Sequence, residues 1–522
     1  MNTYEFVNIA AQIFPEREAL AFEDQRDDYA TLQQRIVSLA AGLRECGLGP
    51  GRRLGVMDTN SSRFIQLFYA TSFLGATFVP LNYRAKSEEL EYLLNTAEVN
   101  CLCAGAPYVE LACTVRPAVT SVKELISIDG PAEGMRSFDE LLLPSVEIEP
   151  AEVDDKELNV IMFTAGTTSR PKGVMIRYGD LASYALNTAE PVSEDDHYAQ
   201  LLVAPFYHIA GLTAIMLAPY SARRMVLLRQ FDPVRWLETV QKERITHAFV
   251  VPTMLKRIID EPSFGRYDLS SLEMLSYGSA ATPPGVLLRA LELFPRNVGF
   301  INAYGQTETT ATVSMLGPDD HRMEGAPEEI ERKKSRLRSI GKPLPDAEIR
   351  IVGEQGETLP AGQIGEVAIR TARATQGYLA KKGEEGHVAK RDTEGWLHTS
   401  DLGWIDDEGY VFLAGRKSDM IIRGGENISP EEVEAVLYRH PAVEDVAVIG
   451  LPDEEWGEYV VAIVVPRRES AEKLSAEELI GFCRERLASY KKPSVVHLVN
   501  ELPRSDLGKV RKNVLREQFS AR

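Results

Sequence analysis

The stretch Phe163–Val174, FTAGTTSRPKGV, is the most informative part of this chain. It continues directly from the apolar run Asn159–Phe163, which predicts a buried strand. Glycine lets backbone amides approach an anion closely, hydroxyls add donors and Lys172 adds a positive charge. An ordinary surface loop is the alternative, but the closing Pro-Lys-Gly argues against it. The stretch therefore predicts a phosphate loop, although it lacks the spacing of a Walker loop.

Length, composition and charge describe a globular protein with more than one folding unit. The chain has 522 residues, of which 44% are hydrophobic and 26% are charged, too many residues for a single ordinary core. Its formal net charge is -19, which opposes general affinity for nucleic acid or an anionic membrane. An anionic substrate would therefore need a local group of donors, such as the predicted loop.

No signal peptide or membrane span is expected. The first 22 residues lack both a basic start and a compact apolar core, and no apolar stretch approaches 18 residues. Cys101 and Cys103 could form half of a metal site, but alternation along a buried strand explains their spacing better. The odd, sparse cysteine set favours a reduced, cytoplasmic protein; its members are Cys46, Cys101, Cys103, Cys113 and Cys483.

The order of strands and helices predicts a large α/β domain followed by a small α+β domain. Strand patterns at Asn159–Phe163, His247–Val251 and Glu348–Val352 alternate with helical patterns, which favours layered, mostly parallel sheets over residues 1–414. The polar segment Gly317–Arg338 is expected to be a solvated excursion. Residues 415–419 are expected to be a hinge, and residues 420–522 a mobile lid domain.

Two capped helices and two strands are expected in the small domain. Ser429 and Ser475 each precede a helical pattern with a glutamate three residues later. The second helix is predicted to run to about Tyr490. Val446–Gly450 and Val460–Val465 have the composition of strands.

The predicted loop resembles the phosphate loop of the adenylate-forming superfamily, which includes acyl- and aryl-CoA synthetases, peptide-synthetase adenylation domains and luciferases. The similarity is greatest to fatty-acid and other carboxylic acid–CoA ligases. The usual pattern there is Thr-Ser-Gly-Thr-Thr-Gly-x-Pro-Lys-Gly, and this chain has Ala165 and Ser169 at the first serine and second glycine. The resemblance implies phosphate contacts from Thr164, Gly166, Thr167, Thr168 and Lys172, with Thr168 also near Mg²⁺.

Further motifs follow in the order typical of the family. Ser276–Ala280 (SYGSA) resembles the turn against adenine, which implies contacts from Gly278, Ser279 and Ala280. Tyr304–Glu308 (YGQTE) resembles the next signature, which implies that Tyr304 lies at the nucleotide, Thr307 at the α-phosphate and Glu308 on Mg²⁺. Thr399–Asp401 resembles the ribose-binding Thr-Gly-Asp of the family, with Ser400 in place of the glycine. This resemblance implies ribose contacts from Asp401 and Arg416.

The last motifs imply a moving domain. Lys509, in Pro503–Lys509, resembles the lysine that completes adenylation in this family. Ser418 is the expected pivot, with Asp419 as the alternative one residue on. Gly424 and Gly425 would line the pantetheine passage of coenzyme A. Arg84 is either a contact for a phosphate of coenzyme A or a surface arginine at the start of a helix.

The segment Ala204–Leu212, APFYHIAGL, resembles the part of the family that forms the acid pocket. It lacks the aspartate that amino-acid-activating domains use, which argues against an amino acid. His208 matches a histidine found in many acyl- and aryl-CoA synthetases. The expected apolar wall, which could also be ordinary core, consists of Phe206, Tyr207, Leu212, Tyr277 and Ala303.

Together these features predict an ATP-, Mg²⁺- and coenzyme A-dependent carboxylic acid–CoA ligase that works through an acyl-adenylate. The acid would be apolar: fatty, alicyclic or aromatic. Loading of a carrier protein and a non-catalytic nucleotide- or acyl-binding regulator remain as alternatives, and a homodimer is compatible with the sequence. The residues implied in catalysis are Lys172, His208, Thr307, Glu308 and Lys509.

Overall fold

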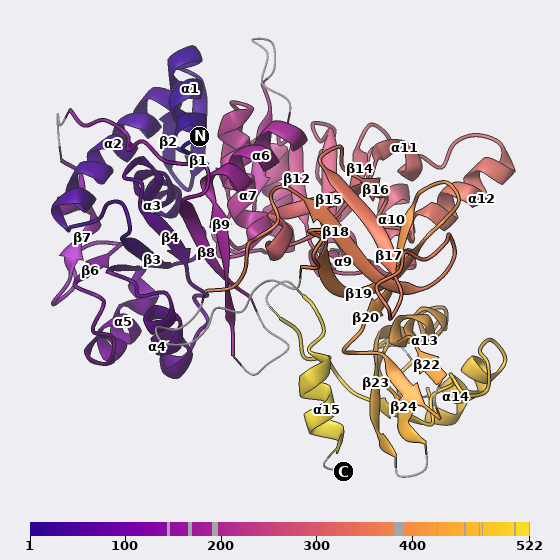
Figure 1. Cartoon of the computed structure of the whole chain (residues 1–522). Helices are drawn as coiled ribbons and strands as arrows, with labels where there is room; N and C mark the ends of the chain where they lie inside the picture. The colour runs from indigo at the N-terminus through magenta and orange to yellow at the C-terminus, as the bar shows by residue number, and fades with distance from the viewer. Residues whose placement is uncertain are drawn as a thin grey trace.

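The computed structural model describes residues 1–522 except 144–146, 165–169, 190–196, 380–390, 425, 454–455, 469, 472, 506–507 and 521–522. Two large sheets and their helices form most of the molecule, and a smaller domain that carries the C-terminus lies below them in Figure 1. No helix among the described residues is long and apolar enough to cross a membrane.

The first large sheet has nine strands in the order β16-β15-β14-β13-β12-β10-β11-β1-β2. The pairs from β14 across to β1 are parallel, and the strands at both edges are antiparallel. Its strands are β1 (Glu18–Phe22), β2 (Gln25–Asp28), β10 (Ala199–Leu202), β11 (Arg224–Leu227), β12 (His247–Val250), β13 (Met274–Gly278), β14 (Gly299–Gln306), β15 (Ala311–Leu316) and β16 (Lys342–Pro343).

The second large sheet has seven strands in the order β7-β6-β5-β3-β4-β8-β9. All its pairs are parallel except β8 with β9, which are antiparallel and oppose Thr164 to Lys172. The predicted phosphate loop therefore joins two adjacent strands as a hairpin. The strands are β3 (Arg53–Met57), β4 (Thr77–Pro80), β5 (Cys101–Ala104), β6 (Glu124–Ser127), β7 (Arg136–Ser137), β8 (Leu158–Thr164) and β9 (Lys172–Arg177).

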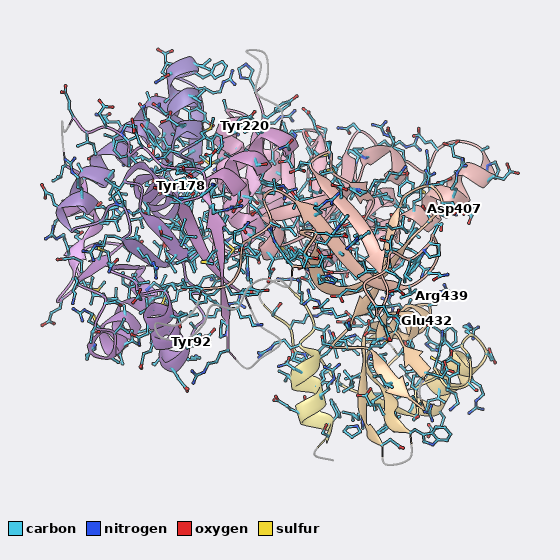
Figure 2. The ribbon with its side chains drawn as sticks, in the orientation of Figure 1. Tyr92, Tyr178, Tyr220, Asp407, Glu432 and Arg439 are labelled. Carbon is cyan, nitrogen blue, oxygen red and sulfur yellow. The ribbon has the colours of Figure 1, made fainter. Side chains whose placement is uncertain are left out.

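Helices cover both faces of each large sheet, which gives alternating helical and sheet layers. One core lies between the two sheets, around α1, α2, α3, α6 and α7, while α8 to α10 and α4 to α5 cover the outer faces. Tyr178, labelled in Figure 2, begins α6 and is fully buried. The helices are α1 (Glu5–Ile13), α2 (Tyr29–Glu45), α3 (Ser62–Phe73), α4 (Ser87–Thr96), α5 (Val109–Val115), α6 (Tyr178–Thr188), α7 (Ile209–Tyr220), α8 (Pro233–Lys242), α9 (Pro252–Ile259) and α10 (Pro284–Leu293).

A four-stranded antiparallel sheet completes the large domain, in the order β17-β18-β19-β20. The segment Gly317–Arg338, expected to be a solvated excursion, contains two helices. The second of them has no buried residue, as expected for a solvated segment, but His321 on the first is buried. These elements are β17 (Ala347–Val352), β18 (Gly365–Thr371), β19 (Leu397–Ile405), β20 (Val411–Arg416), α11 (Pro318–His321) and α12 (Pro327–Arg336).

The C-terminal domain packs helices on a separate five-stranded sheet. Both predicted serine caps are present, because Ser429 and Ser475 each accept a hydrogen bond from the amide three residues later. The second helix ends at Arg484, short of the predicted end near Tyr490, because the chain turns there. The elements are β21 (Ile421–Arg423), β22 (Glu426–Ile428), β23 (Val443–Asp453), β24 (Gly457–Pro466), β25 (Val495–Leu498), α13 (Pro430–Leu437), α14 (Ala476–Arg484) and α15 (Lys512–Ser520).

The change from one domain to the other occurs over four residues. Strand β20 belongs to the sheet of the large domain and ends at Arg416, whereas β21, in the C-terminal sheet, begins at Ile421. The predicted hinge at 415–419 overlaps this connection. Whether the domains divide at these residues in solution stays a prediction.

Candidate active site

Asp401 is at the centre of a hydrogen-bonded group where the nine-stranded and four-stranded sheets meet. Its carboxylate is 6% exposed and accepts from Tyr304 Oη at 2.6 Å and Gln306 Nε2 at 2.9 Å. Arg416, its register partner on β20, approaches the other oxygen at 3.0 Å. Burial, followed by the Asp401 charge, holds the pKa of Tyr304 well above its usual range. The Tyr304 hydroxyl therefore remains a donor to Asp401.

The residue before this aspartate has a strained backbone. Ser400 stands where the family usually has glycine, and its φ is 63°, in the left-handed region. The strain is opposed by local bonds: Ser400 N donates to Glu366 Oε1 at 3.0 Å, and Lys417 N donates to Ser400 O at 2.9 Å. A non-glycine residue there costs about 1 kcal/mol or more. The departure from the family pattern is thus accommodated by a left-handed serine.

Glu308 lies in the short 3₁₀ turn Thr307–Thr309, directly after β14. Tyr378 Oη donates to Glu308 Oε1 at 3.0 Å, and the Tyr378 ring lies 5.2 Å from Lys172 Nζ. Burial, followed by the Glu308 charge, raises the pKa of Tyr378, so the hydroxyl remains a donor. Tyr378 therefore links Lys172 to Glu308, and Thr307 precedes Glu308 in the same turn. The catalytic roles of these three residues stay predictions. Nothing in the local sequence marks out Tyr378.

A buried arginine anchors the turn that carries Glu308. Arg373 has no exposed surface and donates to the carbonyls of Thr309 at 2.6 Å, Thr310 at 3.0 Å and Thr312 at 2.6 Å. It also forms an ion pair with Asp346 at 2.6 Å. Both Thr310 and Ala311 have positive φ, so the arginine holds a strained turn in place.

The residues expected at adenine form a sharp turn after β13. Gly278 lies against Ala303 of β14, where a Cβ would approach Ala303 O to 2.2 Å. Ser279 follows with a φ of 68°, and both Ser279 and Ala280 are partly exposed. The glycine is therefore required by close packing of two strands, which leaves the next two residues at the open edge of the sheet.

Lys509 reaches this site from the C-terminal domain. Its amide donates to Ser505 Oγ at 3.2 Å, and Ser505 N donates to Lys509 O at 2.7 Å, so the turn is closed. More than a third of Lys509 is open to water. Even so, the pKa of its amine is lowered, mainly by burial among protein atoms and then by the charge of Arg416. The charges of Asp401 and Glu308 act in the opposite direction. Its charge is thus influenced by two residues of the four-stranded sheet and by one from the turn after β14 of the nine-stranded sheet.

Two contacts hold the C-terminal domain in this position. Gly508 lies against Thr253 at the first turn of α9, where a Cβ would be 2.3 Å from Thr253 Oγ1. Lys256, one turn further along α9, forms an ion pair with Glu444 at 3.1 Å and with Asp260 at 3.0 Å. The domain is therefore docked with Lys509 directed into the site.

The residues near the predicted hinge and pantetheine passage are only partly described. Asp419 forms an ion pair with Arg516 of α15 at 2.9 Å, while no side-chain interaction involves Ser418 in the described part of the chain. Gly424 has a φ of 60°, and its amide donates to Trp456 O at 2.8 Å. The pivot at Ser418 stays a prediction. Six residues for which the sequence analysis gives expectations lie outside the described part of the chain: Ala165, Gly166, Thr167, Thr168, Ser169 and Gly425.

The predicted acid pocket is formed only in part. His208 precedes α7, and its ring lies 4.2 Å from that of Tyr207. Phe206 is buried against Phe64 at a centroid distance of 5.4 Å. Leu212 has no exposed surface and packs into the core between the large sheets.

Tyr277 does not lie where it was expected. It is 1% exposed, packs with the core under α8 to α10, and bonds through its hydroxyl to His321 Nε2 at 2.8 Å. Strand alternation explains the difference, because consecutive residues of β13 face opposite sides of the sheet. Ala303, its other expected neighbour, lies on β14 beside Gly278.

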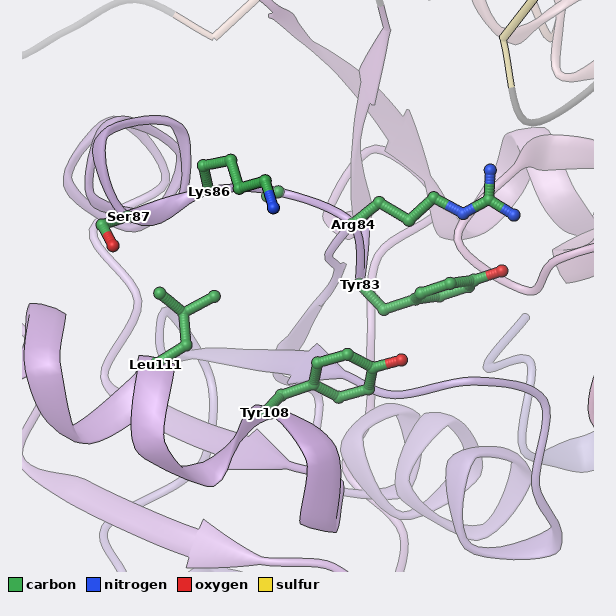
Figure 3. Close-up of a pocket in the computed structure, with 7 residues that line it drawn as sticks. Tyr83, Arg84, Lys86, Ser87, Tyr108 and Leu111 are labelled. Carbon is green, nitrogen blue, oxygen red and sulfur yellow. The ribbon is translucent and has the colours of Figure 1, made fainter.

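Arg84 lines an open pocket of about 650 Å³ on the large domain. Figure 3 shows its guanidinium above the ring of Tyr83, with Tyr108 below and Lys86 on the same loop. The Tyr83 ring also meets Tyr207 edge-on at 5.3 Å, which links this pocket to the acid segment. Two cations and two aromatic rings are suited to a phosphorylated nucleotide.

Comparisons with known proteins agree with this arrangement. The family model for AMP-binding enzymes matches residues 7–379, and the model for the AMP-binding enzyme C-terminal domain matches residues 432–509. The chain belongs to the AMP-binding enzyme family. Its predicted membership of the adenylate-forming superfamily, its fold class and its being an AMP-forming acid–thiol ligase are confirmed.

Three proteins that are similar to the chain along almost its full length are named for forming coenzyme A thioesters. An indoleacetate–CoA ligase from Aromatoleum aromaticum is 33% identical, over 99% of this chain and 98% of the relative. A feruloyl-CoA synthase from an Amycolatopsis species is 32% identical, over 98% and 97%. The solved o-succinylbenzoate CoA synthetase from Bacillus subtilis, in complex with its acyl-adenylate intermediate, is 28% identical with a TM-score of 0.83, over 98% and 97%.

ATP, coenzyme A and Mg²⁺ are the cofactors of this family, and the donor set fits the metal. Among the described residues, no cluster of three or more metal-binding side chains occurs. Glu308 instead offers one hard carboxylate beside Lys172 and Tyr378. Mg²⁺ is commonly held by one or two carboxylates together with substrate phosphates, so a single glutamate in a phosphate site is sufficient.

Proposed function

We propose that this enzyme ligates an apolar aryl or acyl acid to coenzyme A through an acyl-adenylate. The arrangement around Lys509 supports this most directly, because Asp401, Arg416 and Glu308 of the large domain act electrostatically on an amine that the C-terminal domain supplies. Such convergence suits a reaction in which charge gathers on phosphate. The relatives named for indoleacetate and ferulate support an aryl acid.

In the first step, a carboxylate oxygen of the acid attacks the α-phosphorus of ATP, and pyrophosphate leaves. Lys172 and Lys509 hold the phosphates and offset the charge that gathers there. Asp401 orients the ribose, supported by Tyr304 and Gln306. Mg²⁺, held by Glu308, would neutralise phosphate charge when bound.

In the second step, the thiol of coenzyme A attacks the acyl carbon, and AMP leaves as the thioester forms. Lys509 occupies one side of the reacting centre, and the thiol must reach that centre in this step. We therefore infer that the C-terminal domain turns about residues 417–420 between the two steps. Ser418 would be the pivot, and Gly424 and Gly425 would line the passage of the thiol arm.

Coenzyme A is favoured over a carrier protein as the acceptor by the pocket at Arg84. Its cations and rings suit the phosphorylated nucleotide end of coenzyme A, which a carrier protein lacks. His208 would border the reacting end of the acid, beside Phe206 and Tyr207.

The test is pyrophosphate exchange into ATP over a panel of acids, followed by AMP release with coenzyme A added or withheld. Acid-dependent exchange together with release that requires coenzyme A is expected. Exchange without any response to coenzyme A would instead favour a carrier-protein acceptor. No exchange with any acid would contradict the adenylation step.

A further inference from the structure

A narrow cavity lies between the first turns of α7 and strands β10 and β12 of the nine-stranded sheet. It opens beside the predicted acid segment, since Ala204 and Phe206 are part of its wall. Its volume of about 10 Å³ would hold one water molecule, so an acid that enters must displace side chains. The apolar residues that line it are Leu201, Leu202, Val203, Ala204, Phe206, Ala210, Gly211, Ala214 and Phe249.

Helix α7 presents its smallest residues to this cavity. Ala210 and Ala214 are four positions apart and so lie on one face of the helix. Gly211 allows the helix to approach the preceding loop, because a Cβ there would be 2.2 Å from Pro205 O. A ring-shaped ligand would therefore meet methyl groups on one side and the Phe249 ring on the other.

Gln200 is the one polar side chain in the lining of this cavity. Its neighbours Ala199 and Leu201 pack into the core under α8 to α10, whereas Leu202 packs into the core that contains α7. Strand alternation therefore places Gln200 on the α7 side, with Leu202. Its Oε1 atom is buried and has no hydrogen-bond partner among the described residues.

A ligand donor in this cavity would give the buried acceptor a hydrogen-bond partner in place of the one water molecule that the cavity can hold. We propose that Gln200 determines specificity for acids with a hydroxyl or N–H donor at the end remote from the carboxylate. This inference rests on the proposed ligase function and adds the substrate class to it.

The position of Gln200 also sets the length of the acid. Gln200 lies on β10, four positions before Ala204, which follows the end of that strand at Leu202. The carboxylate reacts beyond the Ala204 end, near His208. An acid that reaches from there to the amide must be extended, with its donor carried on a ring or chain well removed from the carboxylate. A second charge is excluded, because the lining offers nothing to pair with it.

Three matched acids test the inference in the pyrophosphate exchange assay with the full chain. 4-Hydroxycinnamate carries a donor, 4-methoxycinnamate carries only an acceptor, and cinnamate carries neither. We expect kcat/KM for the hydroxy acid to exceed that for the other two by about 10- to 100-fold. In Gln200→Leu this preference should fall to about one, because the amide acceptor is gone.

Gln66→Leu is the matched control. Gln66 on α3 is also buried with an unpartnered Oε1, but it does not line the cavity. This variant should keep the full preference for the hydroxy acid. Equal preference in wild type and Gln200→Leu, or an equal loss in both variants, would overturn the role of Gln200.

If Gln200→Leu fails to fold, the ratios of kcat/KM for the three acids in the wild-type enzyme still test the inference. Equal kcat/KM for the three acids, or exchange confined to acids without a donor, would overturn the inference while the proposed ligase function stands. No exchange with any acid would overturn both.

Discussion

Replacing Gly508 with alanine should slow adenylation without slowing thioester formation. The added Cβ would lie 2.3 Å from Thr253 Oγ1 and 2.7 Å from its Cγ2, well inside contact distance. Overpacking of this kind costs about 1–3 kcal/mol, which corresponds to roughly 5- to 150-fold in rate. Because Thr253 is on α9 and Gly508 on the C-terminal domain, the cost applies only when the two domains are docked in this way.

The backbone of Gly508 adds a separate cost. Its φ is 72°, so an alanine there loses about 1 kcal/mol of stability in every conformation that keeps the turn. This part should appear in the free energy of unfolding and leave the ratio of the two half-reactions unchanged. The collision with Thr253 should appear only in that ratio.

The assay compares pyrophosphate exchange with thioester formation from preformed acyl-adenylate, in Gly508→Ala, Thr253→Ala and the double variant. In the double variant the nearest remaining side-chain atom is the Cβ at 3.1 Å, so most of the exchange rate should return. Thr253→Ala alone should resemble wild type. A double variant no faster than Gly508→Ala, or an equal loss in both half-reactions, would refute the reasoning.

Three further outcomes are expected. Lys509→Ala should lower pyrophosphate exchange by about 10²–10³ and spare thioester formation from preformed adenylate; equal losses would contradict its role. Burial raises the pKa of Asp58 to about 6, so its protonated form stabilises the fold and that stability is lost as pH rises through about 6. In urea unfolding between pH 3 and 7, Asp58→Asn should remove up to about 3 kcal/mol of that pH dependence, and an unchanged slope would exclude Asp58 as its source. Arg373→Met should destabilise the protein by about 3–5 kcal/mol, because it leaves Asp346 and three carbonyls unpaired; a loss under 1 kcal/mol would refute the clamp.

Local patterns in the sequence predicted the local structure well. The strands β8, β12 and β17 were expected because each is a short β-branched run, and the starts of α13 and α14 because each has a serine cap. These features depend on a few neighbouring residues. The end of α14 was placed too late because its apolar spacing continues past the point where the chain turns.

The parts of the site that depend on distant segments could not be predicted. Tyr378 reaches Glu308 across 70 positions, and Arg373 reaches Thr309 across 64. Neither contact has a local sequence signal, because each joins segments that are far apart in the chain. The predicted orientation of Tyr277 was wrong for the same reason. Its motif was recognised, but which side of β13 borders the acid pocket depends on how the sheets pack. Gln306 lay inside a quoted motif, and its bond to Asp401 became visible only with the register of β19.

The two ion pairs of Lys256, with Glu444 and with Asp260, affect how easily the domains can separate. When Glu444 withdraws with the C-terminal domain, Lys256 retains Asp260, one turn away on the same helix. Lys256 is therefore not left unpaired when the C-terminal domain moves away. An ion pair this accessible to water is worth only about 0–1 kcal/mol. In the proposed alternation, breaking this ion pair would therefore add little to the cost of undocking the C-terminal domain.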